Sequence, residues 1–182
     1  MNSFVLVTRE PLERARALLE EPWRGLAATP PVSGGRSGAC LDFQGIVRGW
    51  EDAEGEARAP AEAGSSGGTR APANSPAPAE TPAGPVPIAA LEYEAHEEMA
   101  RHQMEKILAR LAETHPLEAA VVIHRIGRVE VGEASLWVRL FAPHRGEALR
   151  ACAEFIDELK KLVPIWKHPL PPADPGHWPR PR

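Results

Sequence analysis

The sequence has little of what several classes of protein require. Its 182 residues include 2 cysteines, too few for a disulfide scaffold, and no Cys/His cluster has the spacing of zinc ligands. No apolar run approaches the roughly 20 residues of a membrane-spanning helix. The first residues lack the basic start and the length of a secretory signal. We therefore expect a soluble, cytoplasmic protein that binds no metal and does not enter a membrane.

Positive charge is not in excess either. The chain carries 21 Lys and Arg residues against 25 Asp and Glu residues, a formal net charge of −4. Proteins that bind nucleic acid through its phosphates are usually basic. This balance therefore argues against a general nucleic-acid binder.

Proline is abundant but unevenly placed. Of the 20 prolines, 7 lie between Pro60 and Pro87 and 6 between Pro169 and Pro181. Residues 59–87 are mostly Ala, Pro, Gly and Ser without an aromatic residue, so they bury too little apolar surface to offset their loss of conformational entropy. We expect one domain over residues 1–168, a disordered insertion within it at 49–87, and an irregular proline-rich tail at 169–182.

Hydrophobic periodicity divides the rest of the chain into strands and helices. Strands are predicted at 4–7, 38–47, 88–93, 119–128 and 135–141, and residues 129–133 are predicted to turn the chain. Helices are predicted at 11–20, around 100–111 and at 145–163. The last helix is expected to bury Leu149, Cys152, Phe155, Ile156, Leu159 and Val163. The fold class is therefore α+β, with an antiparallel sheet packed by helices.

Several cations stand at predicted junctions between elements. Arg48 closes a strand, and His144-Arg145 lies between a strand and a helix. Unpaired N–H groups and the helix dipole favour an anion at such a junction, although a plain turn explains the pair equally well.

Lys160 lies at the edge of the apolar stripe of the last helix, and Lys167 follows Pro164 on an extended segment. Loss of hydration beside apolar surface lowers the pKa of a lysine and makes it a better proton donor or nucleophile. The alternative is a lysine whose stem covers the core edge while its ammonium stays in water.

The cysteines and one histidine leave other hypotheses open. Cys40 and Cys152 have no neighbouring cation that would favour a thiolate, so small core residues are the simpler interpretation than persulfide carriers. His124-Arg125 continues an apolar strand and suits a sheet edge or a subunit contact as well as a ligand contact.

Five segments together resemble one family. They are Gly38-Ala-Cys-Leu-Asp-Phe-Gln-Gly-Ile-Val-Arg48, Leu91-Glu-Tyr-Glu-Ala95, Val122-Ile-His-Arg-Ile-Gly127, His144-Arg145 and Leu159-Lys-Lys-Leu-Val-Pro-Ile-Trp-Lys167. They occur in the order seen in the large, catalytic subunits of molybdopterin synthase. The resemblance implies an α/β-hammerhead-like domain and an enzyme of molybdenum cofactor biosynthesis.

The reaction implied by this resemblance is a sulfur transfer. A small ubiquitin-like subunit carries sulfur as a C-terminal thiocarboxylate, and two transfers to a cyclic pyranopterin monophosphate form the dithiolene. No cofactor is implied, and the expected assembly is a central dimer of large subunits with one small subunit at each end. The alternatives are a non-catalytic homologue that binds pterin or phosphate, and a sulfurtransferase that uses Cys40 or Cys152.

The resemblance also implies roles for individual residues. Lys160 and Lys167 would be catalytic, and Phe43 would lie on the pocket floor. The substrate contacts would come from Ile46, Val47, Arg48, His144, Arg145, Lys160, Lys167, His168 and Pro169. The sequence departs from the family in the long insertion after Arg48, and in His168 and Pro169, where a basic and then an acidic residue are common.

Overall fold

A four-stranded sheet forms the centre of the molecule. In the computed structural model, which describes residues 1–19, 23–24, 36–51 and 85–173, the strand order is β1 (Asn2–Thr8), β6 (Ala119–Arg125), β8 (Ala134–Ala142) and β2 (Ala39–Ile46). β1 runs parallel to β6, and the other neighbouring strands are antiparallel. β2 is therefore one edge of this sheet.

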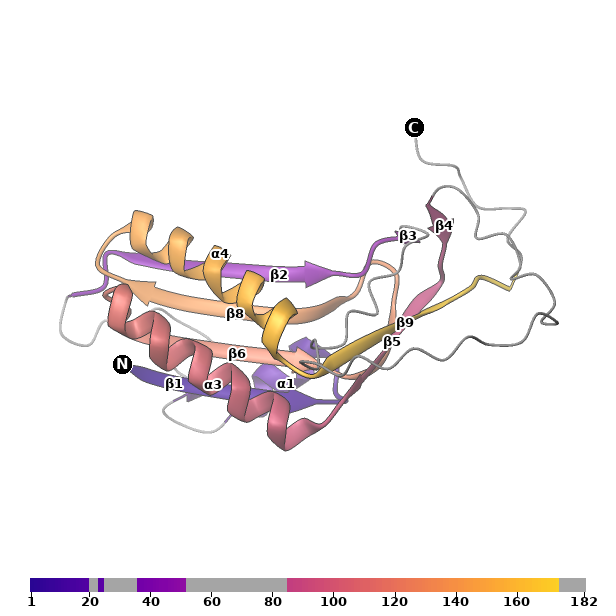
Figure 1. Ribbon diagram of the computed structural model, residues 1–182, viewed down its shortest axis with the longest axis horizontal. Helices are drawn as coiled ribbons and strands as arrows, with labels where there is room; N and C mark the ends of the chain where they lie inside the picture. Colours follow the sequence, from indigo (N-terminus) through magenta and orange to yellow (C-terminus); the bar gives the residue numbers. More distant parts are fainter. Residues whose placement is uncertain (20–22, 25–35, 52–84, 174–182) are drawn as a thin grey trace, which may run out of the picture.

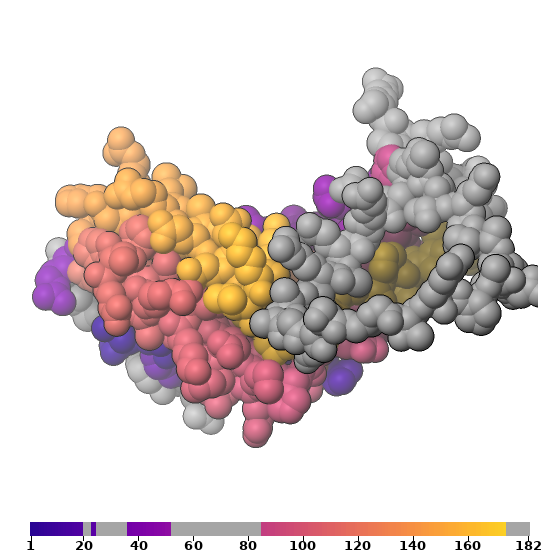
Figure 2. Space-filling model, viewed as in Figure 1, coloured from indigo at the N-terminus to yellow at the C-terminus, as the bar shows by residue number. Residues whose placement is uncertain are grey.

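Helices cover both faces of the four-stranded sheet. α3 (Glu97–Thr114) and α4 (Arg145–Leu162) pack on one face, and the short α1 (Leu12–Ala17) packs on the other (Figure 1). Successive strand residues point to opposite faces, so Val122 joins the cluster under α3 and α4 while Val121 and Ile123 join the one under α1. Figure 2 shows α3 and α4 side by side on the outer surface of the domain.

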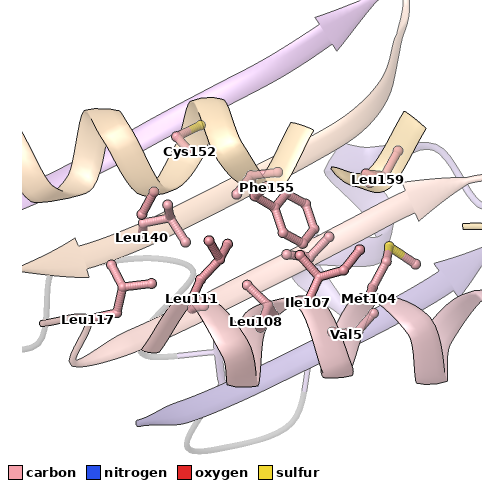
Figure 3. Close-up of a cluster of buried hydrophobic side chains, with 14 of the residues drawn as sticks. Val5, Met104, Ile107, Leu108, Leu111, Leu117, Leu140, Cys152, Phe155 and Leu159 are labelled. Atoms are coloured by element: carbon pink, nitrogen blue, oxygen red, sulfur yellow. The ribbon is translucent and has the colours of Figure 1, made fainter. Parts of the chain in front are cut away.

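The spacing of apolar residues along α3 and α4 explains their burial. α3 buries Ala100, Met104, Ile107, Leu108 and Leu111, and α4 buries Ala148, Ala151, Cys152, Phe155 and Leu159. Steps of three and four residues place each set on one face of a helix. Figure 3 shows Ile107, Leu108 and Leu111 lying against Phe155 and the strand residues Val5 and Leu140.

A second, smaller sheet extends beyond the C-terminal end of α4. Its order is β7 (Gly127–Glu130), β5 (Ala90–Ala95) and β9 (Ile165–Leu170), all antiparallel. β3 (Trp50–Glu51) and β4 (Val86–Pro87) form a short ladder at the same end of the molecule (Figure 1). Val47, Ile88, Leu91 and Val129 form a buried cluster of their own beneath these strands. The expected α+β architecture is confirmed.

The prediction of one continuous strand at 119–128 is wrong. The structure breaks it at Ile126 into β6 and β7, which belong to different sheets. Gly127 has a φ of 78°, a conformation that residues with a Cβ rarely adopt, so the chain changes direction there. The turn predicted at 129–133 begins later, because Val129 and Glu130 are still in β7.

The insertion at 49–87 was predicted to be disordered throughout, but the structure forms strands at both of its ends. Trp50 pairs with Pro87 and Glu51 with Val86 as β3 and β4, and residues 52–84 lie outside the described residues. The irregular tail also begins later than expected, because β9 continues through Pro169 to Leu170. Proline is tolerated there since β9 is an edge strand; residues 174–182 lie outside the described residues.

Two helix predictions need correction. Leu149 was expected to face inward, but it is 56% exposed because it lies on the flank of the stripe through Ala148 and Cys152. The first helix is shorter than the predicted 11–20, with Pro11 at its N-cap and Ala17 as its last residue. Among the described residues no helix is long and apolar enough to cross a membrane.

Two substitutions on α4 test this packing. We expect Phe155→Ala to lower the free energy of unfolding by about 3–5 kcal/mol, because it removes a fully buried ring from the core. Leu149→Ala, on the same helix but exposed, should change it by less than about 0.5 kcal/mol. Urea unfolding measures both. Similar losses for the two variants would contradict this arrangement of α4.

Candidate functional site

The junction of α4 with β9 positions the two predicted catalytic lysines. Lys160 lies in the last turn of α4, between the buried Leu159 and Val163. The N–H of Val163 donates to the carbonyl of Leu159 at 3.1 Å, Pro164 ends the helix, and β9 begins at Ile165. The backbone of Lys160 is therefore fixed, while its side chain is exposed rather than partly desolvated as expected.

Lys167 is held by a buried carboxylate. Its Nζ donates to Oε2 of Glu51 in β3 at 2.7 Å. The side chain of Glu51 is 8% exposed and that of Lys167 is 37% exposed. The carboxylate of the pair is therefore buried, and the lysine is partly open to solvent. In the β5–β9 ladder Lys167 lies opposite Tyr93. Glu51 did not appear among the residues predicted from sequence.

A cluster of neutral polar side chains lies next to this pair. The hydroxyl of Ser135 donates to the phenol oxygen of Tyr93 at 3.1 Å, and the Tyr93 ring meets the His124 ring edge-on at 5.5 Å. Burial raises the pKa of the Tyr93 phenol, the Ser135 hydrogen bond lowers it, and the Glu51 carboxylate raises it. Tyr93 is therefore protonated at neutral pH.

His124 is buried and uncharged. Burial lowers its pKa to about 4, against a smaller rise from its hydrogen bond with the carbonyl of Arg125. The neutral ring uses Nδ1–H to donate to that carbonyl at 2.9 Å. His124 therefore supports the sheet beneath Tyr93 and does not supply a cation to a ligand.

The predicted residues at the end of β2 divide between core and surface. Phe43 is half-buried against the cluster that contains Leu159, which suits a pocket floor. Ile46 and Arg48 are exposed, whereas Val47 is 2% exposed. The N–H of Val47 donates to Glu133 and its carbonyl accepts from Gly132, both at 2.9 Å. Val47 thus anchors the strand end and has no unpaired polar group for a ligand.

His144 and Arg145 lie far from the two lysines. They are exposed at the N-terminal end of α4, whereas Lys160 is 15 residues further along this helix. At 1.5 Å per residue this separation is about 22 Å. β2 runs in the same sense, so Arg48 lies at the lysine end (Figure 1). The segments that carry Arg48, Lys160 and Lys167 therefore lie at one end of the sheet, and His144 and Arg145 lie at the other end of α4.

The two residues after Lys167 continue the edge strand. His168 and Pro169 are exposed, and Nε2 of His168 lies 3.6 Å from a carboxylate oxygen of Glu94. Pro169 lies opposite Leu91 in the β5–β9 ladder. Both residues are therefore on the same strand as Lys167, one and two positions beyond it.

Neither cysteine lies with the lysines. Cys152 is buried on α4, and burial raises the pKa of its thiol. Cys40 is exposed but lies opposite Phe141, at the His144 end of the sheet. Neither position favours a nucleophilic thiolate beside the candidate site.

A surface depression formed by described residues lies elsewhere. It measures about 250 Å³ and is lined by Glu13 of α1, Gln44 and Ile46 of β2, and the ion pair of Arg125 with Glu133. Apart from Ile46, it contains none of the predicted site residues. The described residues also contain no group of His, Cys, Asp and Glu that could hold a metal ion.

Solved structures share this fold. A molybdopterin synthase from Staphylococcus aureus superimposes with a TM-score of 0.57 at 23% identity, covering 93% of this chain and 91% of that one. A molybdopterin biosynthesis MoaE protein from Burkholderia ambifaria gives 0.56 at 22%, covering 92% and 82%. A complex of subunits 1 and 2 of molybdopterin-converting factor from Helicobacter pylori gives 0.52 at 17%, covering 92% and 83%.

Sequence comparison finds related proteins. The family model described as MoaE protein matches residues 81–162 of this chain. Curated relatives named molybdopterin synthase catalytic subunit are 48% identical over 77 residues in Pyrococcus abyssi, covering 42% of this chain and 52% of the relative, and 45% identical over 80 residues in Oryza sativa subsp. indica, covering 44% and 42%. The chain thus spans about half the length of the curated relatives it matches.

The matched segment contains only part of the candidate site. His144, Arg145 and Lys160 lie inside residues 81–162, whereas Phe43, Arg48, Glu51 and Lys167 lie outside it. The match to the family model therefore covers the candidate residues at the two ends of α4. The other candidate residues are placed by the structure alone.

Protonation of His124 should be visible in the stability of the fold. The pKa is lower in the folded chain than the usual 6.5, so the unfolded chain binds the proton first. The stabilisation is complete above pH 6.5 and falls by up to about 3 kcal/mol as the pH drops toward 4. Urea unfolding across this range measures it.

The control is His124→Gln. Its amide can still donate a hydrogen bond, as the imidazole does, but it does not titrate. The difference in unfolding free energy between the two proteins isolates the histidine from the carboxylates that titrate in both. A difference that does not change between pH 7 and pH 4.5 would show that His124 is not buried in its neutral form.

Proposed function

We propose that this chain is the catalytic subunit of a molybdopterin synthase. It would convert cyclic pyranopterin monophosphate to molybdopterin with sulfur from the thiocarboxylated C-terminus of a small ubiquitin-like subunit. The observation that carries the proposal is the placement of Lys160 and Lys167 on either side of one rigid helix–strand junction, with Arg48 at the same end of the sheet.

The charges suit the two reactants. A cyclic phosphate and a thiocarboxylate are both anions, and fixed cations offset their mutual repulsion and stabilise charge that develops during the reaction. In one transfer the sulfur bonds to a side-chain carbon of the pterin and the carbon–oxygen bond to the cyclic phosphate breaks, so the ring opens and the phosphate oxygen leaves. In the other transfer the sulfur replaces an oxygen of the neighbouring carbon, which leaves as water. Water then hydrolyses each thioester between sulfur and the carrier's acyl carbon, so the carrier leaves as a carboxylate. All the sulfur comes from the partner, so neither cysteine nor a cofactor is needed.

We assign the proton donor to Lys160. Its exposed ammonium makes no ion pair with any described residue, and the helix end fixes its backbone. Arrival of the partner's tail would cover this lysine and remove its water, which favours proton transfer to the opening phosphate ester. Exposed Leu162 and Trp166, on the same segment, offer apolar contacts for the partner.

The partners follow from the same geometry. The Helicobacter pylori relative is a complex of two different subunits, and we propose a corresponding small subunit here. We also propose a dimer of this chain, because His144 and Arg145 can reach substrate at Lys160 only from a second copy. The two cysteines, both unpaired, agree with a reducing compartment such as the cytoplasm.

Lys160→Ala should remove product formation. We expect turnover with the thiocarboxylated partner and cyclic pyranopterin monophosphate to fall by at least about a hundredfold, the usual contribution of a positioned proton donor. Lys161→Ala, on the neighbouring exposed position, should retain turnover within about threefold. The assay measures dithiolene product, and binding of the partner checks the fold of each variant.

Three outcomes would contradict the proposal in different ways. Equal turnover in the Lys160→Ala and Lys161→Ala proteins would remove Lys160 from the mechanism. Loss of turnover in Cys40→Ala or Cys152→Ala would favour a cysteine sulfurtransferase. A wild-type chain that binds the pterin and the partner but forms no product would be a non-catalytic homologue.

Mixing two variants tests the contribution of a second copy. Arg145→Ala and Lys160→Ala chains should each be impaired, because each lacks one cation of every site. After subunit exchange, random pairing makes half of the dimers mixed, and one of their two sites is intact, so about a quarter of wild-type turnover should return. No recovery, with exchange verified by mass, would place both residues in one chain's site or leave Arg145 without a role.

A further inference from the structure

Glu51 is an unusual residue at its position. It is a carboxylate with 6% of its surface exposed. It lies in β3, a few residues after the end of β2, and is the last described residue before the gap at 52–84. Buried carboxylates are costly unless a cation or several hydrogen-bond donors pair with them. Its buried position therefore requires Lys167, its ion-pair partner among the described residues.

The backbone around Glu51 is held in place. β3 pairs with β4 through Trp50 with Pro87 and Glu51 with Val86, and the N–H of Ile88 donates to the carbonyl of Gly49 at 3.0 Å. Buried Val47 anchors the same segment from the other side. The Glu51 carboxylate is thus presented from a strand that is held in place by β4, which ends at Pro87 shortly before β5 begins at Ala90.

The opposing lysine is fixed only at its backbone. β9 pairs with β5 along its length and places Lys167 opposite Tyr93, but a lysine side chain has four rotatable bonds. The 2.7 Å contact with Glu51 selects one arrangement of that side chain. Lys160, exposed and without an ion pair among the described residues, has no such restraint.

The pair leaves part of the ammonium available. An ammonium has three N–H donors; the contact with Glu51 uses one, and the lysine is 37% exposed. The other donors can meet an anion arriving from the open side. Because Glu51 cancels the charge of Lys167 at a distance, Lys167 contributes direction more than long-range attraction, which is left to Lys160 and Arg48.

We propose that Glu51 is a positioning residue: it holds the Lys167 side chain toward the open side of the α4–β9 junction. Its catalytic consequence rests on the proposed function, but the restraint on Lys167 does not. The neighbouring Tyr93 hydroxyl, bonded to Ser135, closes the cluster on the buried side.

Competitive labelling of amines measures the restraint directly. The full chain is treated with a trace of acetic anhydride at constant pH, and mass spectrometry compares the labelling of Lys167 with that of exposed Lys161. We expect Glu51→Gln to raise this ratio on the order of tenfold, the effect typical of losing a charge-assisted hydrogen bond. Glu51→Asp should give a smaller rise, because it keeps the charge but shortens the reach.

Turnover gives the second readout. In Glu51→Gln, kcat should fall by about tenfold or more while KM changes by less than about threefold, because the lost interaction orients a reacting group rather than attracting substrate. Glu51→Asp should recover part of kcat. Glu130→Gln is the matched control: it removes an exposed carboxylate paired with Arg128 on β7 and should alter neither readout.

A double-mutant cycle covers the case in which Glu51→Gln is destabilised too much for assays of turnover but still melts cooperatively. Glu51→Gln and Lys167→Met each leave one partner unpaired, so the double variant should melt at a higher temperature than the sum of the two single losses predicts. Additive losses would show that the two side chains do not interact, and would overturn the proposal.

The readouts separate this inference from the proposed function. Unchanged labelling and unchanged kcat in Glu51→Gln, with an active wild-type chain, would overturn the positioning role alone. A changed labelling ratio in a wild-type chain that makes no product would support the restraint on Lys167 and overturn the proposed reaction. An equal fall in kcat in the Glu51→Asp and Glu51→Gln proteins, without a change in labelling, would also overturn the positioning role of Glu51.

Discussion

The antiparallel pairing of β9 with β5 is the interaction on which the candidate site depends. This ladder takes the chain from the end of α4 and fixes Lys167 opposite Tyr93, next to the buried carboxylate of Glu51. β9 begins at Ile165, directly after the end of α4 at Leu162. The ladder therefore also fixes the position of the last turn of α4, which carries Lys160. Backbone hydrogen bonds, rather than contacts between the functional side chains, thus bring the two lysines into one region.

The length of α4 separates the predicted site residues of one chain into two groups. His144 and Arg145 stand at one end of an 18-residue helix and Lys160 at the other. A helix is too rigid for its ends to meet, so a shared site requires two chains. The buried face of α4 explains why this separation is structural: Phe155 and Leu159 pack into the main core and fix the helix against the sheet. The proposed site and the proposed dimer therefore depend on the same packed helix.

The charged and neutral groups near the junction have complementary effects. Lys160 and Arg48 are exposed and contribute positive charge to solvent, whereas Lys167 is paired and contributes a fixed direction. Beneath them, Tyr93 and His124 are buried without charge, so the floor of the region does not compete with an anionic ligand. The arrangement can attract anions and orient them with different residues.

The sequence by itself determined the class of the fold, most strands and helices, and the segments that resemble one family, because periodic apolar residues and local motifs encode these features. It could also single out Lys160 and Lys167, which lie on a short local segment. It could not show the break at Gly127, the burial of Val47 or the exposure of Leu149, since these depend on which elements pack together. Nor could it find Glu51, 116 residues from Lys167 along the chain. Only tertiary structure decided that pairing and the separation of His144 from Lys160, because both follow from how rigid elements are placed in space.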